Sequence, residues 1–265
     1  MIPAPERADQ GDGPFERLII RGVIVIDGAG APPQGPIDLV IEGNRIAEVR
    51  GVGAPGALID DTRRPQTATR EIDAQGMYVM PGFVDLHTHI GGVPKAPEAE
   101  YTFKLWMGHG VTTVRDAGGG ARDWVLRERD RSERNEIVAP RIVAYGRPGT
   151  GEGWEGGSIR SAETAREWVR WAAAKGVEGL KLGAYDPSIM EALIDEAKQL
   201  GMGTMAHLGQ NGVGRMNAID AARLGLGTVT HYYGLFESLL KDYTVQNWPP
   251  SQNQSNEQDR FGQVA

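Results

Sequence analysis

Cysteine is absent from this chain of 265 residues. Its absence excludes disulfide bonds, thiol nucleophiles and thiolate metal sites, so any bound metal must have nitrogen and oxygen ligands. Long apolar runs are also missing. No stretch of about 18 apolar residues is present to span a bilayer, and residues 1–10 contain no apolar core of a signal peptide. We therefore expect no membrane association and a cytoplasmic location.

Clustered positive charge is lacking as well. The net charge is -7 and the sequence pI is about 5.3, whereas binding to nucleic acid requires grouped Lys and Arg side chains that neutralise phosphates. Nucleic acid is therefore not an expected partner. Glycine is abundant, with 37 residues, which is typical of a turn-rich enzyme-like domain. The length suffices for one large domain with a small companion.

Residues 1–79 have the pattern of an all-β unit. A nearly continuous apolar run rich in Val and Ile at 18–26 is typical of a buried strand. Residues 37–41 and 45–49 flank Gly43-Asn44, two residues that tolerate positive φ, so this pair predicts a hairpin. Two further short strands are predicted at 71–73 and 77–80.

From residue 80 to residue 241, short apolar strands alternate with stretches of helical periodicity, the pattern of βαβ units and a parallel sheet. Six strands are predicted, at residues 82–89, 111–116, 141–145, 179–182, 203–208 and 228–232. The clearest helices are predicted at residues 161–175, 188–200 and 213–224. The fold class is α/β, with a TIM-like (β/α) barrel that is incomplete in this chain. Residues 242–265 are expected to be a polar loop or tail.

Four of the five histidines stand at the ends of predicted strands. His87 and His89 are two residues apart, so their side chains share one face of a strand. Taken alone, such a pair is explained as well by two hydrogen-bonded core histidines. His207 and His231, however, close two other predicted strands. Because the C-terminal ends of parallel barrel strands meet at one mouth, and neutral imidazole is a common metal ligand, the four histidines predict a metal site.

Lys181 lies between Leu180 and Leu182 in a predicted strand, so the leucines should face the helices and the lysine the barrel interior. A buried ammonium is costly without a partner. An ion pair with Asp or Glu is one resolution, and carbamylation by carbon dioxide, which makes a bridging anion, is the other. Asp85 should face the same interior, where it orients an imidazole or a backbone group in the second shell of the site, or is a structural carboxylate.

The remaining polar residues near the predicted strand ends carry weaker signals. Asp116, at the end of the second barrel strand, either reaches the site or caps a turn. His109 is expected to be structural, beside a helix terminus. Tyr145, Tyr185 and Gln210 are no more than candidates for the mouth, so the substrate-binding residues stay unknown at this stage.

Three motifs carry a resemblance to a known family. They are Val-Met-Pro-Gly-Phe-Val-Asp-Leu-His-Thr-His at residues 79–89, Gly-Val-Thr-Thr-Val-Arg-Asp at 110–116 and Ile-Asp-Gly-Ala-Gly at 26–30. With the other histidines and the lysine, they make residues 18–240 similar to the amidohydrolase superfamily, in the branch of imidazolonepropionase-like enzymes and prolidase-like dipeptidases. The resemblance implies a small β-sandwich subdomain ahead of the barrel.

The resemblance also implies a ligand set and a reaction. His87 and His89 would bind the more buried of two divalent metal ions, His207 and His231 the more exposed one, and Lys181 would bridge both as a carbamate. Zinc is the expected metal, with one or two ions per chain. Enzymes of this kind activate a hydroxide on the metal and cleave the C–N bond of a small-molecule amide, cyclic amide or dipeptide-like substrate.

The sequence departs from the family pattern because only six barrel strands are predicted. The catalytic Asp that shuttles the proton, expected on an eighth strand, would lie beyond residue 265. The chain is therefore interpreted as truncated after strand six, or as completed by a second chain or in a homo-oligomer. Two other readings stay open: an inactive fragment or non-catalytic scaffold of the same fold, and a mononuclear deaminase in which Lys181 is unmodified. The number of metal ions per chain separates them.

Overall fold

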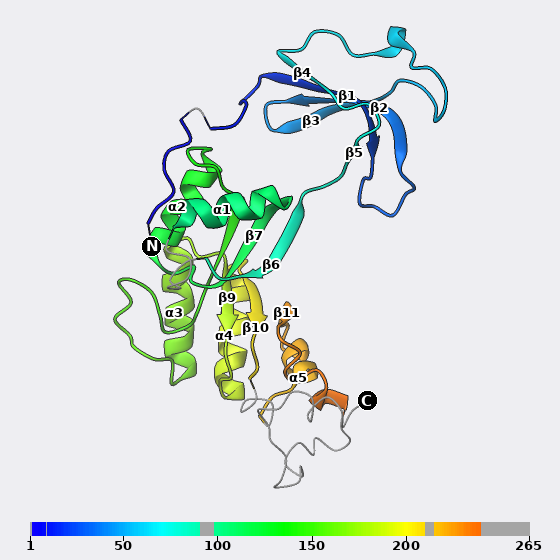
Figure 1. The fold of residues 1–265 in the computed structure, drawn as a ribbon. Coiled ribbons are helices and arrows are strands. Elements are labelled where there is room, and N and C mark those ends of the chain that lie inside the picture. The colour runs from blue at the N-terminus through cyan, green and yellow to red at the C-terminus, as the bar shows by residue number, and fades with distance from the viewer. Residues whose placement is uncertain (1, 9, 91–97, 210–214, 240–265) are drawn as a thin grey trace. The chain divides into compact units, whose positions relative to one another are not determined.

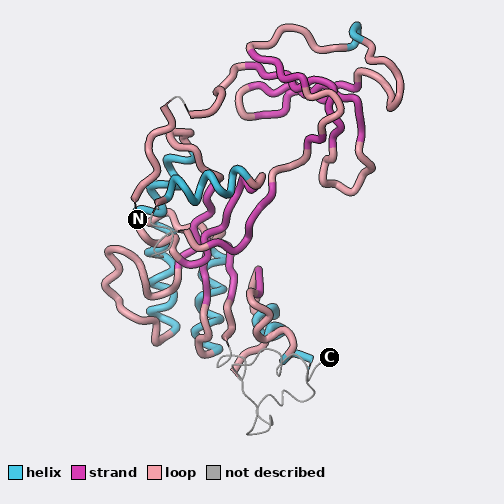
Figure 2. The backbone as a smooth tube through the Cα atoms, in the orientation of Figure 1, coloured by secondary structure: helices cyan, strands magenta, loops and turns pink. Residues whose placement is uncertain are grey.

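A computed structural model of the chain describes residues 2–8, 10–90, 98–209 and 215–239. The chain divides into two compact units, one of Ala8–Phe83 and one of Met1–Arg7 with Val84–Ala265. Strands dominate the smaller unit, whereas the α-helices all belong to the larger one (Figure 2). The expected tail at 242–265 and Gln210 lie outside the described residues.

The smaller unit is built on one mixed sheet (Figure 1). Its strands are β1 (Arg17–Val25), β2 (Gln34–Glu42), β3 (Arg45–Gly51), β4 (Arg70–Asp73) and β5 (Tyr78–Val79). The order is β3-β2-β1-β4, with β5 pairing the far end of β1. The predicted hairpin at Gly43-Asn44 is confirmed as the antiparallel pair β2–β3. A single sheet forms where a small sandwich is expected, because all five strands pair edge to edge around β1 and β2.

The first residues of the chain pack on the larger unit. Ile2 forms a parallel bridge with Glu98, and the backbone N–H of Ala4 donates to the buried carboxylate of Glu128 at 3.1 Å. The N–H of Arg7 donates to the carbonyl of Glu136 at 2.6 Å. The N-terminal segment therefore belongs with the residues after 83 and not with the strands that follow it directly.

The larger unit contains a six-stranded sheet in the order β11-β10-β9-β8-β7-β6. The strands are β6 (Phe83–Thr88), β7 (Val111–Gly118), β8 (Arg141–Gly146), β9 (Gly179–Leu182), β10 (Gly203–Ala206) and β11 (Thr228–Val229). The registered pairs from β7 to β11 are all parallel. Sequential order and parallel pairing confirm an incomplete TIM-like barrel, with the C-terminal strand ends along one edge.

Helices occupy the connections between these strands (Figure 1). They are α1 (Ala99–Gly108), α2 (Asp123–Glu133), α3 (Ala162–Ala174), α4 (Pro187–Gln199) and α5 (Ala218–Arg223), with 3-10 turns η1 (Asp61–Arg63) in the smaller unit and η2 (Glu237–Leu239) in the larger. Among the described residues, no helix combines the length and apolar composition that crossing a membrane requires.

Helix α3 shows how a capping residue and apolar periodicity in the sequence determine the start and the buried face of a helix. The hydroxyl of Ser161 accepts the N–H of Thr164 at 3.1 Å, which caps the first turn. The buried face repeats at helical spacing through Ala165, Trp168 and Ala172. This face packs with the outward leucines of β9 and with α4 in one core, so Trp168 is a packing residue.

Two predicted boundaries in the larger unit are wrong by three residues or more. Helix α5 begins at Ala218 and not at residue 213, because Asn217 and Asp220 form a capping box that fixes the first turn there. The last strand ends at Val229 and not at residue 232, because His231 and Tyr232 adopt left-handed φ values of 63° and 64°. Such values are uncommon for non-glycine residues and turn the chain out of the strand.

A buried carboxylate fixes the chain at the ends of β6 and β7. Asp116 is 1% exposed, and its two oxygens accept the N–H groups of Ile90 at 2.9 Å and Gly119 at 2.6 Å. A Cβ on Gly119 would lie 2.8 Å from Asp116, so only glycine fits there. Burial raises the pKa of Asp116 to about 6, against the opposing effect of the two N–H donors. The sequence left open whether Asp116 reaches the site or caps a turn, and its two hydrogen bonds show that it caps the turn.

The raised pKa of Asp116 has a measurable consequence. A carboxyl group with a folded-state pKa above its unfolded value adds stability at low pH, and this contribution is lost as the pH rises through about 6. Raising the pH from 5 to 7.5 should therefore lower the free energy of unfolding of the wild type by roughly 1 kcal/mol more than that of Asp116→Asn. Urea titrations at the two pH values measure the difference.

The exposed Asp123 provides the control. Asp123→Asn removes an ion pair with Lys175, but its free energy of unfolding should change with pH as that of the wild type does. Equal pH dependence of Asp116→Asn and the wild type would show that the buried carboxyl group keeps an ordinary pKa.

Candidate metal centre

The structure brings four histidines together at the C-terminal edge of the six-stranded sheet. His87 lies in β6 and His89 directly after it, while His207 and His231 follow β10 and β11. The ring centroid of His87 is 5.2 Å from that of His89 and 4.6 Å from that of His231. The ring centroids of His231 and His207 are 4.7 Å apart. Strands at opposite edges of the sheet thus contribute to one cluster.

Lys181 sits at the centre of this cluster. Its side chain lies in β9 and is 5% exposed. The amine nitrogen is 3.2 Å from Nε2 of His87 and donates to the hydroxyl of Thr230 at 3.2 Å. That hydroxyl donates in turn to the carbonyl of Ala206 at 2.9 Å. Within the described residues no carboxylate pairs with Lys181, so the ion pair considered from the sequence is not formed there.

The electrostatics of the cluster favour uncharged nitrogen. Burial lowers the pKa of His87 to about 4, with the charge of Lys181 as the next cause. The pKa values of His89 and His207 are lowered by the same burial and by neighbouring cations. Burial also lowers the pKa of Lys181 to about 8, assisted by Arg147. At neutral pH these imidazoles are in the form that can bind a metal.

The implied metals can be tested against this donor set. In the described part of the chain, no group of three or more histidine, cysteine, aspartate or glutamate side chains is gathered around one point suited to an ion. The ligand set implied by the resemblance requires only two imidazoles for each ion, with a modified lysine as the shared anion. Four clustered imidazoles around a buried amine with a lowered pKa fit that set chemically.

Two other predicted residues have clear local roles. Asp85 accepts the backbone N–H of His87 at 3.0 Å, so it holds a backbone group and contacts no imidazole in the described hydrogen bonds. His109 is the C-cap of α1, and its Nδ1 is 2.8 Å from the carbonyl of Leu105. The fifth histidine is therefore structural, as expected from its position at a helix end.

Tyr145 is not at the mouth. Its ring fills the barrel interior with Ala117 and Met205, on the level of Gly179, its partner in the β8–β9 register. A Cβ on Gly179 would lie 2.3 Å from the ring, so a glycine is needed beneath it. Tyr185 does lie beyond β9, where its hydroxyl donates to the carbonyl of Pro148 at 3.3 Å.

The sequence analysis missed three residues of this region. Thr230 holds the amine of Lys181, Tyr233 stacks on His207 with ring centroids 4.8 Å apart, and Arg147 follows β8 beside the cluster. The signal for Arg147 was its place directly after a barrel strand that ends without a histidine. Because barrel active sites are built from the loops at the C-terminal strand ends, an arginine in this loop was a candidate for a substrate contact.

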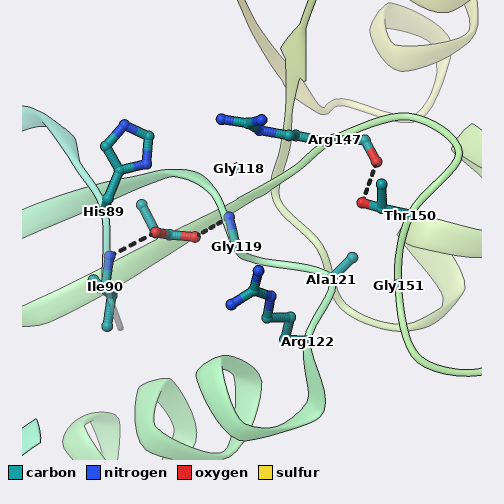
Figure 3. A pocket seen from close by; sticks show the side chains of 10 residues that line it. His89, Ile90, Gly118, Gly119, Ala121, Arg122, Arg147, Thr150 and Gly151 are labelled. Carbon is teal, nitrogen blue, oxygen red and sulfur yellow. Dashed lines mark hydrogen bonds between the residues drawn. The ribbon is translucent and has the colours of Figure 1, made fainter. Parts of the chain in front are cut away.

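A cavity of about 380 Å³ adjoins the cluster. His89 and Ile90 form part of its wall, and the end of β7 together with the loops after β7 and β8 forms the remainder. Arg122 and Arg147 are its cationic side chains. Figure 3 shows Arg147 extending from its loop toward His89, with Arg122 on another side of the same space. The candidate metal centre thus opens into a space large enough for a small organic molecule.

The chain is similar to several known proteins. A D-hydantoinase of Streptomyces coelicolor is 36% identical over 104 residues, covering 38% of this chain and 20% of that protein. An imidazolonepropionase of Aromatoleum aromaticum is 31% identical over 125 residues, covering 47% and 29% of the two chains. The solved structure of a prolidase complexed with N-methylphosphonate-L-proline matches with a TM-score of 0.61 at 24% identity, covering 80% of this chain and 60% of the prolidase.

The chain spans less than two thirds of the length of each of these proteins. The prolidase comparison establishes the fold, which agrees with the parallel sheet described above. A match to the Amidohydrolase family extends over residues 78–244, more than half of the chain, and includes all four clustered histidines and Lys181. The chain therefore belongs to the amidohydrolase family.

Proposed function

We propose that this chain supplies the metal centre of a hydrolase that cleaves a C–N bond in an amide, a cyclic amide or a dipeptide-like substrate. The observation that carries the proposal is the cluster itself: imidazoles with lowered pKa values surround a buried amine at the C-terminal strand ends of a family barrel. Membership of the amidohydrolase family supports it, as do relatives named D-hydantoinase and imidazolonepropionase.

In this proposal His87 and His89 would hold one divalent ion, His207 and His231 would hold a second, and zinc suits the nitrogen ligands. Lys181 would supply the shared anionic ligand as a carbamate. Carbamylation requires the unprotonated amine, and a pKa of about 8 leaves part of the population in that form at neutral pH. The lysine nitrogen then bonds to the carbon of carbon dioxide and releases a proton.

Bound ions would supply Lewis acidity that activates water and polarises a carbonyl oxygen. The chain's own residues prepare the site. Thr230 fixes the direction of the Lys181 side chain through its hydroxyl, Asp85 fixes the backbone at His87, and the left-handed backbone at His231 aims that residue out of its strand. Strained conformations of this kind persist where the surroundings fix them, and they cluster at functional sites.

A cytoplasmic location, an oligomer and a second chain that completes the barrel stay predictions. A non-catalytic scaffold and a deaminase with one ion per chain are the alternatives to the two-metal hydrolase, and the count of bound ions distinguishes them.

Metal content tests the proposal directly. After incubation with zinc and removal of excess, we expect about two ions per chain for the wild type, in line with two-metal hydrolytic sites. The double variant His87→Ala, His207→Ala removes one imidazole from each pair and should bind close to none. Elemental analysis provides the measurement, with circular dichroism to confirm that each protein is folded.

His109→Ala is the matched control, because it removes the one histidine outside the cluster and should leave the metal content unchanged. A folded wild type without zinc would refute the metal centre in this chain. One ion per chain would favour the mononuclear alternative.

The lysine carbamate makes a separate prediction. Wild-type protein loaded with zinc in bicarbonate buffer should bind more metal than protein loaded in buffer depleted of carbon dioxide, because the bridging anion forms only in the first. In Lys181→Arg the two conditions should give the same content, since a guanidinium keeps its proton and cannot be carbamylated. Equal metal content of the wild type in both buffers would contradict the carbamate.

A further inference from the structure

Arg147 and Arg122 present two positive charges to the cavity beside the cluster. Within the described residues, neither guanidinium has an ion pair or a side-chain hydrogen bond, whereas most other arginines of the larger unit pair with a carboxylate or donate to a carbonyl. Two unpaired cations facing one cavity repel each other and favour an anion between them.

The loop that carries Arg147 is held in place. The carbonyl of Arg147 accepts the N–H of Thr150 at 3.1 Å and its hydroxyl at 2.7 Å. The indole of the fully buried Trp168 donates to the carbonyl of Thr150 at 2.9 Å. A packed tryptophan in α3 thus anchors the turn, so the position of Arg147 is determined by the core.

The glycine run after β7 makes room for the arginine. A Cβ on Gly118 would lie 2.6 Å from Nε of Arg147, and Gly118 has a φ of 123° that other residues rarely adopt. The Arg147 side chain therefore lies directly over the Gly118 backbone. The sequence pattern Gly118-Gly119-Gly120, which matches no nucleotide-binding motif, has a role in this packing.

Asp116 is the one carboxylate among the residues that line the cavity. Its two oxygens already accept the N–H groups of Ile90 and Gly119, and it forms no ion pair within 4.0 Å with either arginine among the described contacts. Even fully ionised, one carboxylate leaves two guanidinium groups with a net positive charge. The cavity is therefore cationic where it meets His89.

We propose that this cavity is the subsite for a carboxylate of the substrate, an inference that rests on the proposed function. Arg147 is the principal residue that binds the carboxylate, and Arg122 is the second. The substrate class is then an N-acyl amino acid or a dipeptide with a free carboxylate near the scissile C–N bond. A guanidinium matches a carboxylate with two parallel N–H donors, and the volume of about 380 Å³ suits a group of amino-acid size.

The position of the subsite relative to the cluster agrees with this assignment. His89 belongs both to the cluster and to the cavity wall. A carboxylate bound at Arg147 would place an adjacent amide bond next to the histidines.

Isothermal titration calorimetry with a matched pair of probes tests the subsite. Racemic N-acetylalanine and its amide, N-acetylalaninamide, differ in the carboxylate alone. We expect the wild type to bind the acid about 10- to 100-fold more tightly than the amide, the range of a charge-assisted hydrogen-bond pair. Arg147→Gln should lower the affinity for the acid to that for the amide, and Arg122→Gln should produce part of this loss.

Arg141→Gln is the matched control. Arg141 is exposed at the opposite end of the same strand, β8, and its removal changes the net charge equally. It should leave the preference for the acid unchanged. Inorganic phosphate is a further probe, and phosphate binding more tightly than N-acetylalanine would overturn the assignment to a carboxylate.

The titrations are run on zinc-loaded and on chelator-treated protein, with the metal content of every sample determined. A preference for the acid in both samples, lost in Arg147→Gln at unchanged metal content, supports the subsite. A preference that appears only with zinc, or that survives in Arg147→Gln, shows that the carboxylate binds elsewhere and overturns it. A chain without zinc refutes the proposed function alone, because the chelator-treated comparison still tests the subsite.

Discussion

The burial of Lys181 among imidazoles, with no carboxylate partner in the described part of the chain, is the constraint on which the larger unit depends. Lys181 is 5% exposed, and its described neighbours are an imidazole and a hydroxyl. Desolvation at this point lowers the pKa of the lysine to about 8 and that of His87 to about 4. At neutral pH the imidazole of His87 is therefore uncharged, and part of the Lys181 population is uncharged as well. Uncharged amine and imidazole nitrogens have lone pairs free for a cation or for carbon dioxide.

The surrounding structure maintains this arrangement at the strand ends. Asp116 ties the chain after β6 to the loop after β7, Thr230 connects Lys181 to β10, and Trp168 anchors the loop after β8. Each contact joins the ends of neighbouring elements. The cluster and the arginine-lined cavity therefore depend on one set of packed strand ends, and a change in one loop affects both.

Much of this organisation could be predicted from the sequence. The four histidines stand at strand ends, and alternation within β9 predicts that Lys181 faces inward between outward leucines. Both signals can be read from single strands, because the side-chain period and the position of a strand's end are visible in the sequence. The assignment of each residue to a particular metal ion depends on the family resemblance.

Other features depend on contacts between residues far apart in sequence. The cationic cavity requires Arg147 to lie over Gly118, and nothing in the loop that carries the arginine shows this. Tyr145 was a candidate for the mouth because it lies near the end of a strand. Its ring lies in the interior instead, because glycines on the next two strands leave room for it there. The two left-handed residues after β11 also have no clear sequence signal, because no glycine marks the positions that adopt positive φ.

X-ray absorption spectroscopy at the zinc edge of the loaded chain tests the central claim most directly, because it reports the ligands of the bound ion. If the buried histidines and lysine form a two-metal centre, the spectrum should show about two imidazoles per zinc and a second zinc at roughly 3.5–4 Å. Zinc with one imidazole or none, and without a neighbouring ion, would contradict the claim that the clustered histidines form this centre.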